Sequence, residues 1–488
     1  MTDATPRRRS LILAICCSSL FVVSLDNTIV NVALPSVARD LGSSLSALQW
    51  VVDAYLLVLA SLLMLAGSTG DRIGRRRIFQ IGLGIFGLGS LLCSLAPTTG
   101  SLIAFRMVQA VGGSMMNPVA MSIITNTFPD RRERARAIGM WGSVAGISMA
   151  LGPLLGGVLV DAVGWRSIFW VNVPVTVAAI VLTARYVPES RSDRPRRVDP
   201  LGQVLIVALL GGVTFGIIET PARGIGSPAV LGAFAVALVA AVVLVPVELR
   251  RREPLLDPRF FRSVSFSSAT VIAVAAFAAL AGFLFLNALY LQGVRGYSAL
   301  HAGLLTLPMA AGVALLPPLS GRLVGTRGPR IPLVVGGIGL AAGGVLLTTL
   351  ADATPIALLM VAYVVFGIGS GMVNAPITYA TVSGMPPSQA GVAAAVASTS
   401  RQVGSALGIA VLGAIVTAGT TGAGATGLAQ ASHTAWWVVT GCGIGVAVLG
   451  VVCTSGWGRR VDDRAAEVIA AHAERRHEAA TTTRAATT

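Results

Sequence analysis

The chain has 488 residues, of which 54% are hydrophobic and only 12% are charged. A soluble protein of this length would need several domains and far more charge to cover its surface. Apolar runs of about 18 or more residues recur instead, each long enough to cross roughly 30 Å of hydrocarbon. The composition therefore predicts an all-α polytopic membrane protein. It excludes a soluble enzyme and argues against a nucleic-acid partner.

The hydropathy pattern predicts fourteen membrane spans. They lie near 11–34, 47–67, 77–96, 101–125, 137–160, 167–185, 201–219, 228–249, 267–290, 301–321, 331–350, 355–380, 400–419 and 433–455. With this count most arginines, Arg401 included, fall in loops on one side, which the positive-inside rule assigns to the cytoplasm. Both termini are then cytoplasmic, and the net charge of +15 is a cytoplasmic surplus in a bacterial cell membrane.

The chain also repeats itself weakly. Residues 106–117 align with residues 363–374, and further matches keep an offset between 254 and 257 residues. Two parallel six-helix halves around a midplane cavity are the architecture of a rocking secondary transporter. The predicted divisions are an N-terminal bundle (1–200), two inserted helices with a linker (201–262), a C-terminal bundle (263–456) and a cytoplasmic tail (457–488).

The first span contains a single ionisable residue, Asp26, within the stretch SLDNTIVNVALP at residues 24–35. An intramembrane carboxylate is costly, so it marks an ion or substrate path by default. At 1.5 Å per residue, Asp26, Asp53 and Arg106 share about one level of the membrane. Arg106 is the only arginine placed well inside a predicted span rather than at its end, and Asp26 is its better partner. If Asp26 and Arg106 pair in one transport state and separate in another, Asp26 would take up and release a proton. The alternative is a static pair that fixes helix packing.

Asn27, Thr28 and Asn31 follow Asp26 and give the first span a polar stripe. We expect Asp26 and this stripe to face the cavity between the halves. Gln109 lies one helical turn from Arg106, where it would bond either substrate or Arg106. The candidate substrate-cavity residues are Asn27, Asn31, Gln109, Asn117 and Asn374.

The loop after the second span reads GSTGDRIGRRR, residues 67–77. Its glycines permit a tight turn, Asp71 with Arg72 offers a charge pair, and the following arginines suit anionic lipid headgroups. The alternative is a plain basic loop that only sets topology. The candidate cytoplasmic-gate residues are Gly67, Asp71, Arg72, Gly74, Arg75, Arg76 and Glu133.

The fifth predicted span is rich in glycine and contains a Gly-Pro pair. Small residues about every four positions let another helix approach closely, and a mid-span Gly-Pro allows bending. The two interpretations are close packing and a hinge or seal between the halves. The candidate hinge residues are Gly146, Gly152, Pro153, Gly156 and Gly157.

These segments resemble a known family. LDNTIVNVALP, GxxxDRxGRRR, RxxQ, GxxxxxLGPxxGG and WRSIFWVNVP are similar to motifs of the fourteen-span drug:proton antiporters of the major facilitator superfamily. The resemblance implies inner-gate roles for Asp71 and Arg72, export for the Gly-Pro helix, and proton coupling or substrate response for Asp26 and Arg106. One departure is Gly325, which stands where the first half has Asp71 and implies asymmetric gate charges.

The sequence therefore predicts a monomeric, proton-coupled exporter of small lipophilic compounds, with cations among the candidates. No P-loop, catalytic cluster or metal-ligand spacing is visible, so we expect no enzyme activity and no cofactor besides the proton. The alternatives are a proton symporter for uptake and an exporter dedicated to one natural product.

Overall fold

The computed structural model describes residues 6–192, 199–251, 257–383, 390–420 and 427–458, with 460–462, 464, 465 and 467 of the tail. Within these residues, fourteen helical segments are long and apolar enough to cross a membrane, as predicted. Most of the predicted tail, 457–488, lies outside the described residues. The protein is thus an all-helical, multi-pass membrane protein.

The helices are named in chain order. The first group is α1 (Pro6–Leu41), α2 (Leu45–Ile73), α3 (Arg75–Ser94), α4 (Thr99–Thr127), α5 (Arg131–Ala162), α6 (Ser167–Trp170) and α7 (Asn172–Tyr186). Next come α8 (Pro200–Arg223), α9 (Pro228–Arg250) and the short η1 (Pro258–Arg262). The last group is α10 (Val264–Leu289), η2 (Tyr290–Val294), α11 (Ala299–Leu315), α12 (Pro317–Arg327), α13 (Arg330–Leu347), α14 (Ile356–Ser383), α15 (Ala390–Thr420) and α16 (Leu428–Cys453).

Some spans are built from two helices. α6 and α7 share the span Ser167–Tyr186, and α11 and α12 share the span Ala299–Arg327. The second break falls at Pro317, which has no N–H to continue the helical ladder but suits the first position of a new helix. Polar side chains cap the free backbone N–H groups at the starts of several helices. Ser44 accepts from the N–H of Ala47, and Thr98 forms a capping box at the start of α4.

Equivalent helices pack in equivalent pairs in the two parts of the chain. α1 packs on α5 as α10 packs on α15, and α3 packs on α4 as α13 packs on α14. The two parts meet where α5 lies against α11 and α2 lies against α15. This recurrence is what the sequence repeat would produce, although the residue boundaries of the halves stay a prediction.

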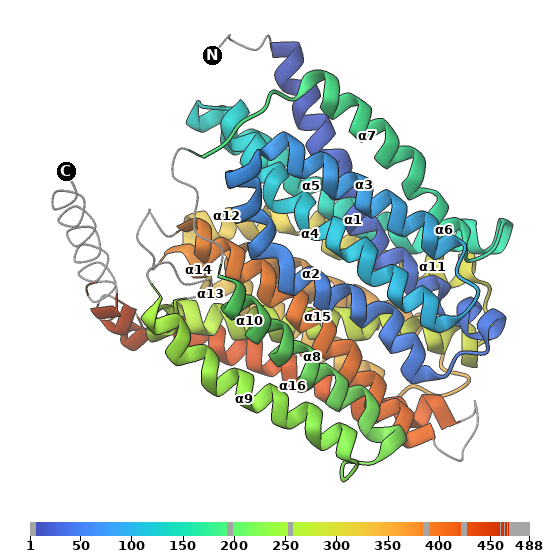
Figure 1. Ribbon diagram of the computed structural model, residues 1–488. Coiled ribbons are helices and arrows are strands. Elements are labelled where there is room, and N and C mark those ends of the chain that lie inside the picture. Colours follow the sequence, from blue (N-terminus) through green and yellow to red (C-terminus); the bar gives the residue numbers. More distant parts are fainter. Residues whose placement is uncertain are drawn as a thin grey trace, which may run out of the picture.

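The inserted helices lie at the edge of the bundle (Figure 1). α8 packs on α2 and α15, and Trp50 Nε1 donates to Glu219 Oε1 at 3.0 Å. α9 packs mainly on α8 and exposes many large apolar side chains. Such a surface suits contact with lipid tails rather than with a transported compound.

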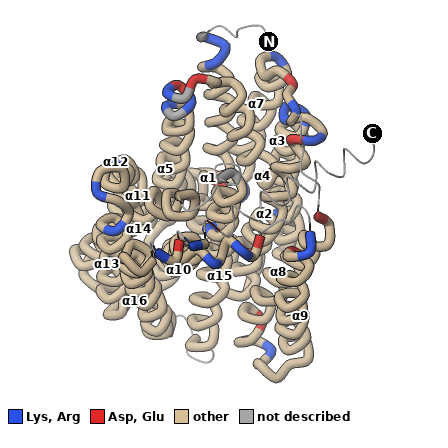
Figure 2. The backbone as a smooth tube through the Cα atoms, turned by 90° about the vertical axis from the view of Figure 1, so that its left-hand side faces the viewer, with Lys and Arg blue, Asp and Glu red and all other residues tan. Residues whose placement is uncertain are grey.

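The start of α1 and the end of α16 lie at the same end of the bundle (Figure 1), which we call the inner face; the other end is the outer face. Figure 2 turns this inner face toward the viewer and shows many blue segments across it. This agrees with the arginine bias that led us to expect a cytoplasmic inner face.

The helix that contains Arg401 begins earlier than predicted. The predicted span starts near residue 400, whereas α15 begins at Ala390, so Arg401 lies within a helix rather than at its boundary. The nine helical steps from Val392 to Arg401 correspond to about 14 Å. The Ala-rich segment before Arg401 was left out of the predicted span.

The glycines of α5 form a seam between α1 and α11. A Cβ on Gly152 would overlap Oγ1 of Thr28 in α1, and one on Gly156 would lie 2.8 Å from Cγ1 of Ile29. On the other side, a Cβ on Gly157 would lie 2.5 Å from the Cα of Leu300 in α11. The helix continues unbroken past Pro153, whose carbonyl lies against Gly303. In this conformation, the candidate hinge residues Gly152, Gly156 and Gly157 are closely packed between α1 and α11.

We predict that Gly152→Ala destabilises the protein, because the added methyl group meets Thr28 with no free space. Overpacking of this kind costs about 1–3 kcal/mol. Gly142→Ala is the matched control on the same helix, since nothing lies within 4 Å of its Cβ position. The thermal midpoint of the purified proteins measures both. An unchanged midpoint for Gly152→Ala, or an equal drop for both, would contradict the seam.

Candidate functional site

The carboxylate of Asp26 lies at the centre of a buried polar network. Its Oδ2 pairs with Nη1 of Arg106 on α4, and its Oδ1 accepts from Nε2 of Gln109 at 2.8 Å. Nδ2 of Asn172 on α7 donates to the same Oδ1 at 3.1 Å. These four side chains are at most 1% exposed. The expected pairing of Asp26 with Arg106 is present.

Further contacts fix the network from α3 and α2. Ser90 accepts from Gln109 at 2.7 Å and from Asn172 at 3.2 Å. Arg106 donates its Nε to the carbonyl of Val51 at 3.3 Å and its Nη1 to Oε1 of Gln109 at 2.6 Å. Its guanidinium carbon lies 4.0 Å from the centre of the Tyr55 ring, a cation–π geometry. The ion pair therefore joins α1, α2, α3, α4 and α7.

Ser90 and Asn172 were missed in the sequence analysis. Asn172 belongs to the WRSIFWVNVP segment, yet it was not singled out as a polar residue in an apolar run. Neutral polar side chains in membranes are common enough that neither residue stands out. The signal that could have found them is the requirement that a buried carboxylate receive several donors.

Our expectation that Asp26 faces a cavity shared by the two halves is wrong for this structure. The side chain is enclosed within the N-terminal helices. Successive helical residues are turned by about 100°, so Asp26 and Thr28 point to nearly opposite sides of α1. Asp26 faces α4 and α7, whereas Thr28 and Asn31 line a different pocket.

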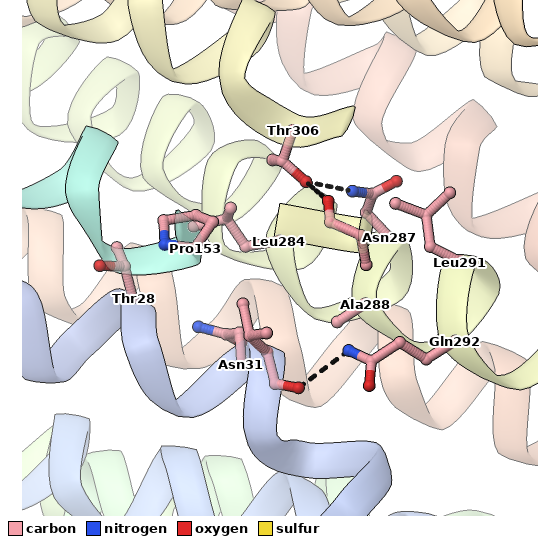
Figure 3. A pocket seen from close by; sticks show the side chains of 11 residues that line it. Thr28, Asn31, Pro153, Leu284, Asn287, Ala288, Leu291, Gln292 and Thr306 are labelled. Atoms are coloured by element: carbon pink, nitrogen blue, oxygen red, sulfur yellow. Dashed lines mark hydrogen bonds between the residues drawn. The ribbon is translucent and has the colours of Figure 1, made fainter. Parts of the chain in front are cut away.

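That pocket is a narrow space between the two halves (Figure 3). It is lined by Thr28, Asn31, Val32, Pro153, Leu284, Asn287, Ala288, Leu291, Gln292, Ala302 and Thr306. Asn287 donates to Thr306 at 3.3 Å, and Gln292 donates to the carbonyl of Val32 at 2.8 Å. Oδ1 of Asn31 is buried without a hydrogen-bond partner among the described residues. The pocket therefore presents polar groups from both halves.

Two asparagines of this pocket are related by the repeat. Asn31 and Asn287 are separated by 287 − 31 = 256 residues, which falls within the repeat offset. The ion-pair network has no such counterpart. Tyr363 and Phe366 stand at the positions equivalent to Arg106 and Gln109, and they pack with Phe283 in an aromatic cluster. The Tyr363 hydroxyl donates to Oδ1 of Asn287.

The other candidate cavity residues lie apart from this pocket. Asn27 accepts from Asn31 Nδ2 through its backbone carbonyl at 3.1 Å, while Gln109 is part of the Asp26 network. Asn117 is half-buried, and its Oδ1 has no partner among the described residues. Asn374 is exposed and accepts from Arg401 at 3.2 Å.

Asp53 is fully buried, and neither of its carboxylate oxygens has a hydrogen-bond partner in the described part of the chain. It does not join the network of Asp26 and Arg106 as its depth suggested. One turn earlier, Gln49 donates to the carbonyls of Ile409 and Ala410 at 3.1 and 3.0 Å. Asp53 therefore lies on the face of α2 that is turned toward α15.

The candidate gate loop is organised differently from our expectation. Asp71 pairs with Arg75 at 2.7 Å rather than with Arg72, which is exposed. Arg75 is one helical turn away and can reach back, whereas adjacent residues point apart. Gly74 has φ +132°, a conformation that favours glycine.

Glu189, a residue that the sequence analysis missed, covers the same loop. It accepts from the backbone N–H of Arg76 at 3.1 Å and lies 3.8 Å from Arg77. Two other gate candidates lie elsewhere. Glu133 pairs with Arg9 at 3.3 Å, and Gly67 packs against Pro118 of α4.

Comparisons with known proteins agree with this architecture. Residues 16–409 match the family model described as Major Facilitator Superfamily. The chain belongs to the major facilitator superfamily. Proteins of this superfamily are membrane transporters, so this chain is a transport protein and not an enzyme.

Several relatives are more than 30% identical. The "Multidrug resistance protein Stp" of Mycobacterium tuberculosis is 38% identical over 82% of this chain and 74% of its own length. The "Methylenomycin A resistance protein" of Streptomyces coelicolor is 37% identical over 81% and 83% of the two chains. The "Multidrug efflux pump LfrA" of Mycolicibacterium smegmatis is 34% identical over 86% and 82%.

Solved transporter structures share the fold at low sequence identity. An inward-facing bacterial homologue of the human lysosomal transporter Spinster has a TM-score of 0.61 at 18% identity, covering 96% of this chain and 98% of its own. The nucleoside transporter NupG has a TM-score of 0.65 at 11% identity, covering 91% and 100%.

We predict strong coupling between Asp26 and Arg106 in stability. Asp26→Asn or Arg106→Gln alone leaves a buried group without its counter-charge, which costs about 3–5 kcal/mol. The double variant should lose less than the sum, because no uncompensated charge remains. Asp40→Asn is the control, since its pair with Arg166 is half-exposed and should contribute little. Additive losses in thermal unfolding would contradict the coupling.

Proposed function

We propose that this transporter exports small organic compounds from the cell and is driven by inward proton flow. The observation that carries the proposal is the double role of α1. One side of this helix holds the buried pair of Asp26 with Arg106, and another side lines the pocket between the halves through Thr28 and Asn31. The printed names of the relatives, multidrug efflux and antibiotic resistance proteins, support the outward direction.

The proposal needs no energy source other than the proton gradient. One elementary charge that crosses the membrane is worth about 2.3 kcal/mol per 100 mV. One chain supplies both sides of the pocket, so we propose a monomer that works without a metal, an organic cofactor or a nucleic acid. The bilayer and the transported compound are its partners.

Proton coupling would act through the ion pair. A proton on Asp26 would leave the guanidinium of Arg106 buried without its counter-charge, a situation that strongly destabilises a packed interior. Protonation is therefore expected to accompany a shift of α1 against α4 and α7. Asp53, which has no partner among the described residues, is the second candidate for a proton in the cycle.

The shift of α1 would reach the transported compound directly. Thr28 and Ile29, which follow Asp26 within one turn, contact the α5 glycines at the seam. Movement there changes both the pocket and the contact with α11. In the proposed cycle, the compound binds from the inner face while Asp26 is ionised, and protonation after rocking releases it outward. Reciprocal linkage requires that bound compound disfavour the protonated form.

We predict that Asp26→Asn loses pH-gradient-driven transport by at least about tenfold, equivalent to about 1.4 kcal/mol. Its remaining transport should no longer respond to the pH gradient or to the uncoupler, because residue 26 can no longer take up and release a proton. The measurement uses the full chain in proteoliposomes, a panel of toxic organic compounds and an uncoupler. Asp352→Asn, on an exposed loop residue, is the control.

The outcomes separate the alternatives. Full gradient-driven transport by Asp26→Asn would remove Asp26 from the coupling step. Wild-type transport that ignores the gradient and the uncoupler would refute proton coupling. Transport of compound in the same direction as the proton would identify a symporter instead of an exporter. Activity on one compound alone would identify a dedicated exporter.

A further inference from the structure

Arg401 lies within the apolar helix α15 and has no carboxylate partner in the described part of the chain. Its Nη1 donates to Oδ1 of Asn374 and to Oγ1 of Thr378 on α14, both at 3.2 Å. No ion pair joins it to a described acidic residue, whereas Arg106 in the other half is paired with Asp26. An unpaired intramembrane charge is costly and marks a functional site by default.

The surroundings of Arg401 present mostly hydrogen-bond donors. Its Nε and Nη2 have no described hydrogen-bond partner, and they are not among the buried atoms that lack one. Oδ1 of Asn374 is taken by the arginine, which leaves the amide nitrogen of Asn374 free to donate. The hydroxyl of Thr378 donates to the carbonyl of Asn374 at 3.3 Å. A ligand group that accepts hydrogen bonds fits such a site, whereas a cationic group does not.

The site is open to a ligand on the inner side. Asn374 and Thr378 are exposed although both lie well within α14. The described hydrogen bonds between residues 6–192 and the helices from α10 onward come from Gln49, Asp161 and Gln292, close to the outer face. The helices thus meet by hydrogen bonds on the outer side, while the Arg401 group is accessible farther inward.

We propose that Arg401, Asn374 and Thr378 form a binding site for an anionic group of the transported compound, such as a carboxylate or phenolate. The planar guanidinium matches a carboxylate with two parallel hydrogen bonds, and such charge-assisted bonds are strong in partly buried sites. The guanidinium carbon also lies 5.9 Å from the Phe277 ring on α10, which offers an aromatic surface beside the charge. The inference rests on the proposed export function and specifies its substrate class as aromatic anions.

A lipid headgroup is the other source of an anionic oxygen. The helical span Val392–Thr420 is longer than the roughly 30 Å hydrocarbon core, and Arg401 lies about 14 Å from its start, so the inner headgroup region is within reach of this long side chain. The test therefore includes a lipid headgroup as a separate outcome.

The test compares two dyes that share a xanthene scaffold, anionic fluorescein and cationic rhodamine 6G. Binding to the full chain in phosphatidylcholine nanodiscs is followed by fluorescence anisotropy. Wild type should bind fluorescein at least about tenfold more tightly than rhodamine 6G, the effect of one charge-assisted contact. Arg401→Gln should remove this preference. Arg401→Lys should keep part of it, because lysine retains the positive charge but lacks the two parallel N–H donors of the guanidinium.

A second variant guards against misfolding of Arg401→Gln. Thr378→Asp places a carboxylate beside Arg401 and should occupy the site from within, which again removes the preference for fluorescein. Thr326→Asp adds the same charge on exposed α12 and should leave the preference intact.

Three results would overturn the inference. Wild type that does not favour fluorescein, equal loss of both dyes in Arg401→Gln, or a preference that appears only when phosphatidylglycerol is added would each do so. The last would assign the site to lipid. Binding is measured without a proton gradient, so a failure of proton-driven export would leave this result readable on its own.

Discussion

The pairing of Asp26 with Arg106 is the interaction on which the N-terminal helices depend. Two opposite charges within an apolar bundle need hydrogen bonds from their surroundings to offset the cost of burial. Gln109 on α4 and Asn172 on α7 donate to the carboxylate, and Ser90 on α3 accepts from both amides. The network therefore fixes how these helices meet, and any change in the charge of Asp26 must change that arrangement.

The two repeats have kept the same helix packing while diverging in chemistry. Where one half has Arg106 and Gln109, the other has Tyr363 and Phe366 in an aromatic cluster that needs no counter-charge. In the pocket, Asn31 and Asn287 match across the repeat. A charged half beside an apolar half suits a division of labour in which one bundle responds to protons and the other forms a firm wall.

Hydropathy was sufficient to predict the fold, because each span must satisfy its backbone within the helix and present apolar residues to lipid. The cost of intramembrane charge likewise predicted the partner of Arg106. The side of a helix on which each residue lies was harder to predict. Residues on several sides of α1 are polar, so the sequence did not reveal that Asp26 turns away from the pocket. The start of α15 was misplaced because a positive charge in an alanine-rich segment resembles the end of a span.

The seam at α5 would connect the proposed proton site on α1 with the pocket. Gly152 and Gly156 bring the α5 backbone against α1 within one or two turns of Asp26, and Gly157 brings the same helix against α11. Helices packed this closely leave no free space between them. Packed interiors resist small displacements and shift between discrete arrangements instead. A rearrangement that begins at the carboxylate must therefore be absorbed at the contact between α5 and α11, where the two bundles separate or close.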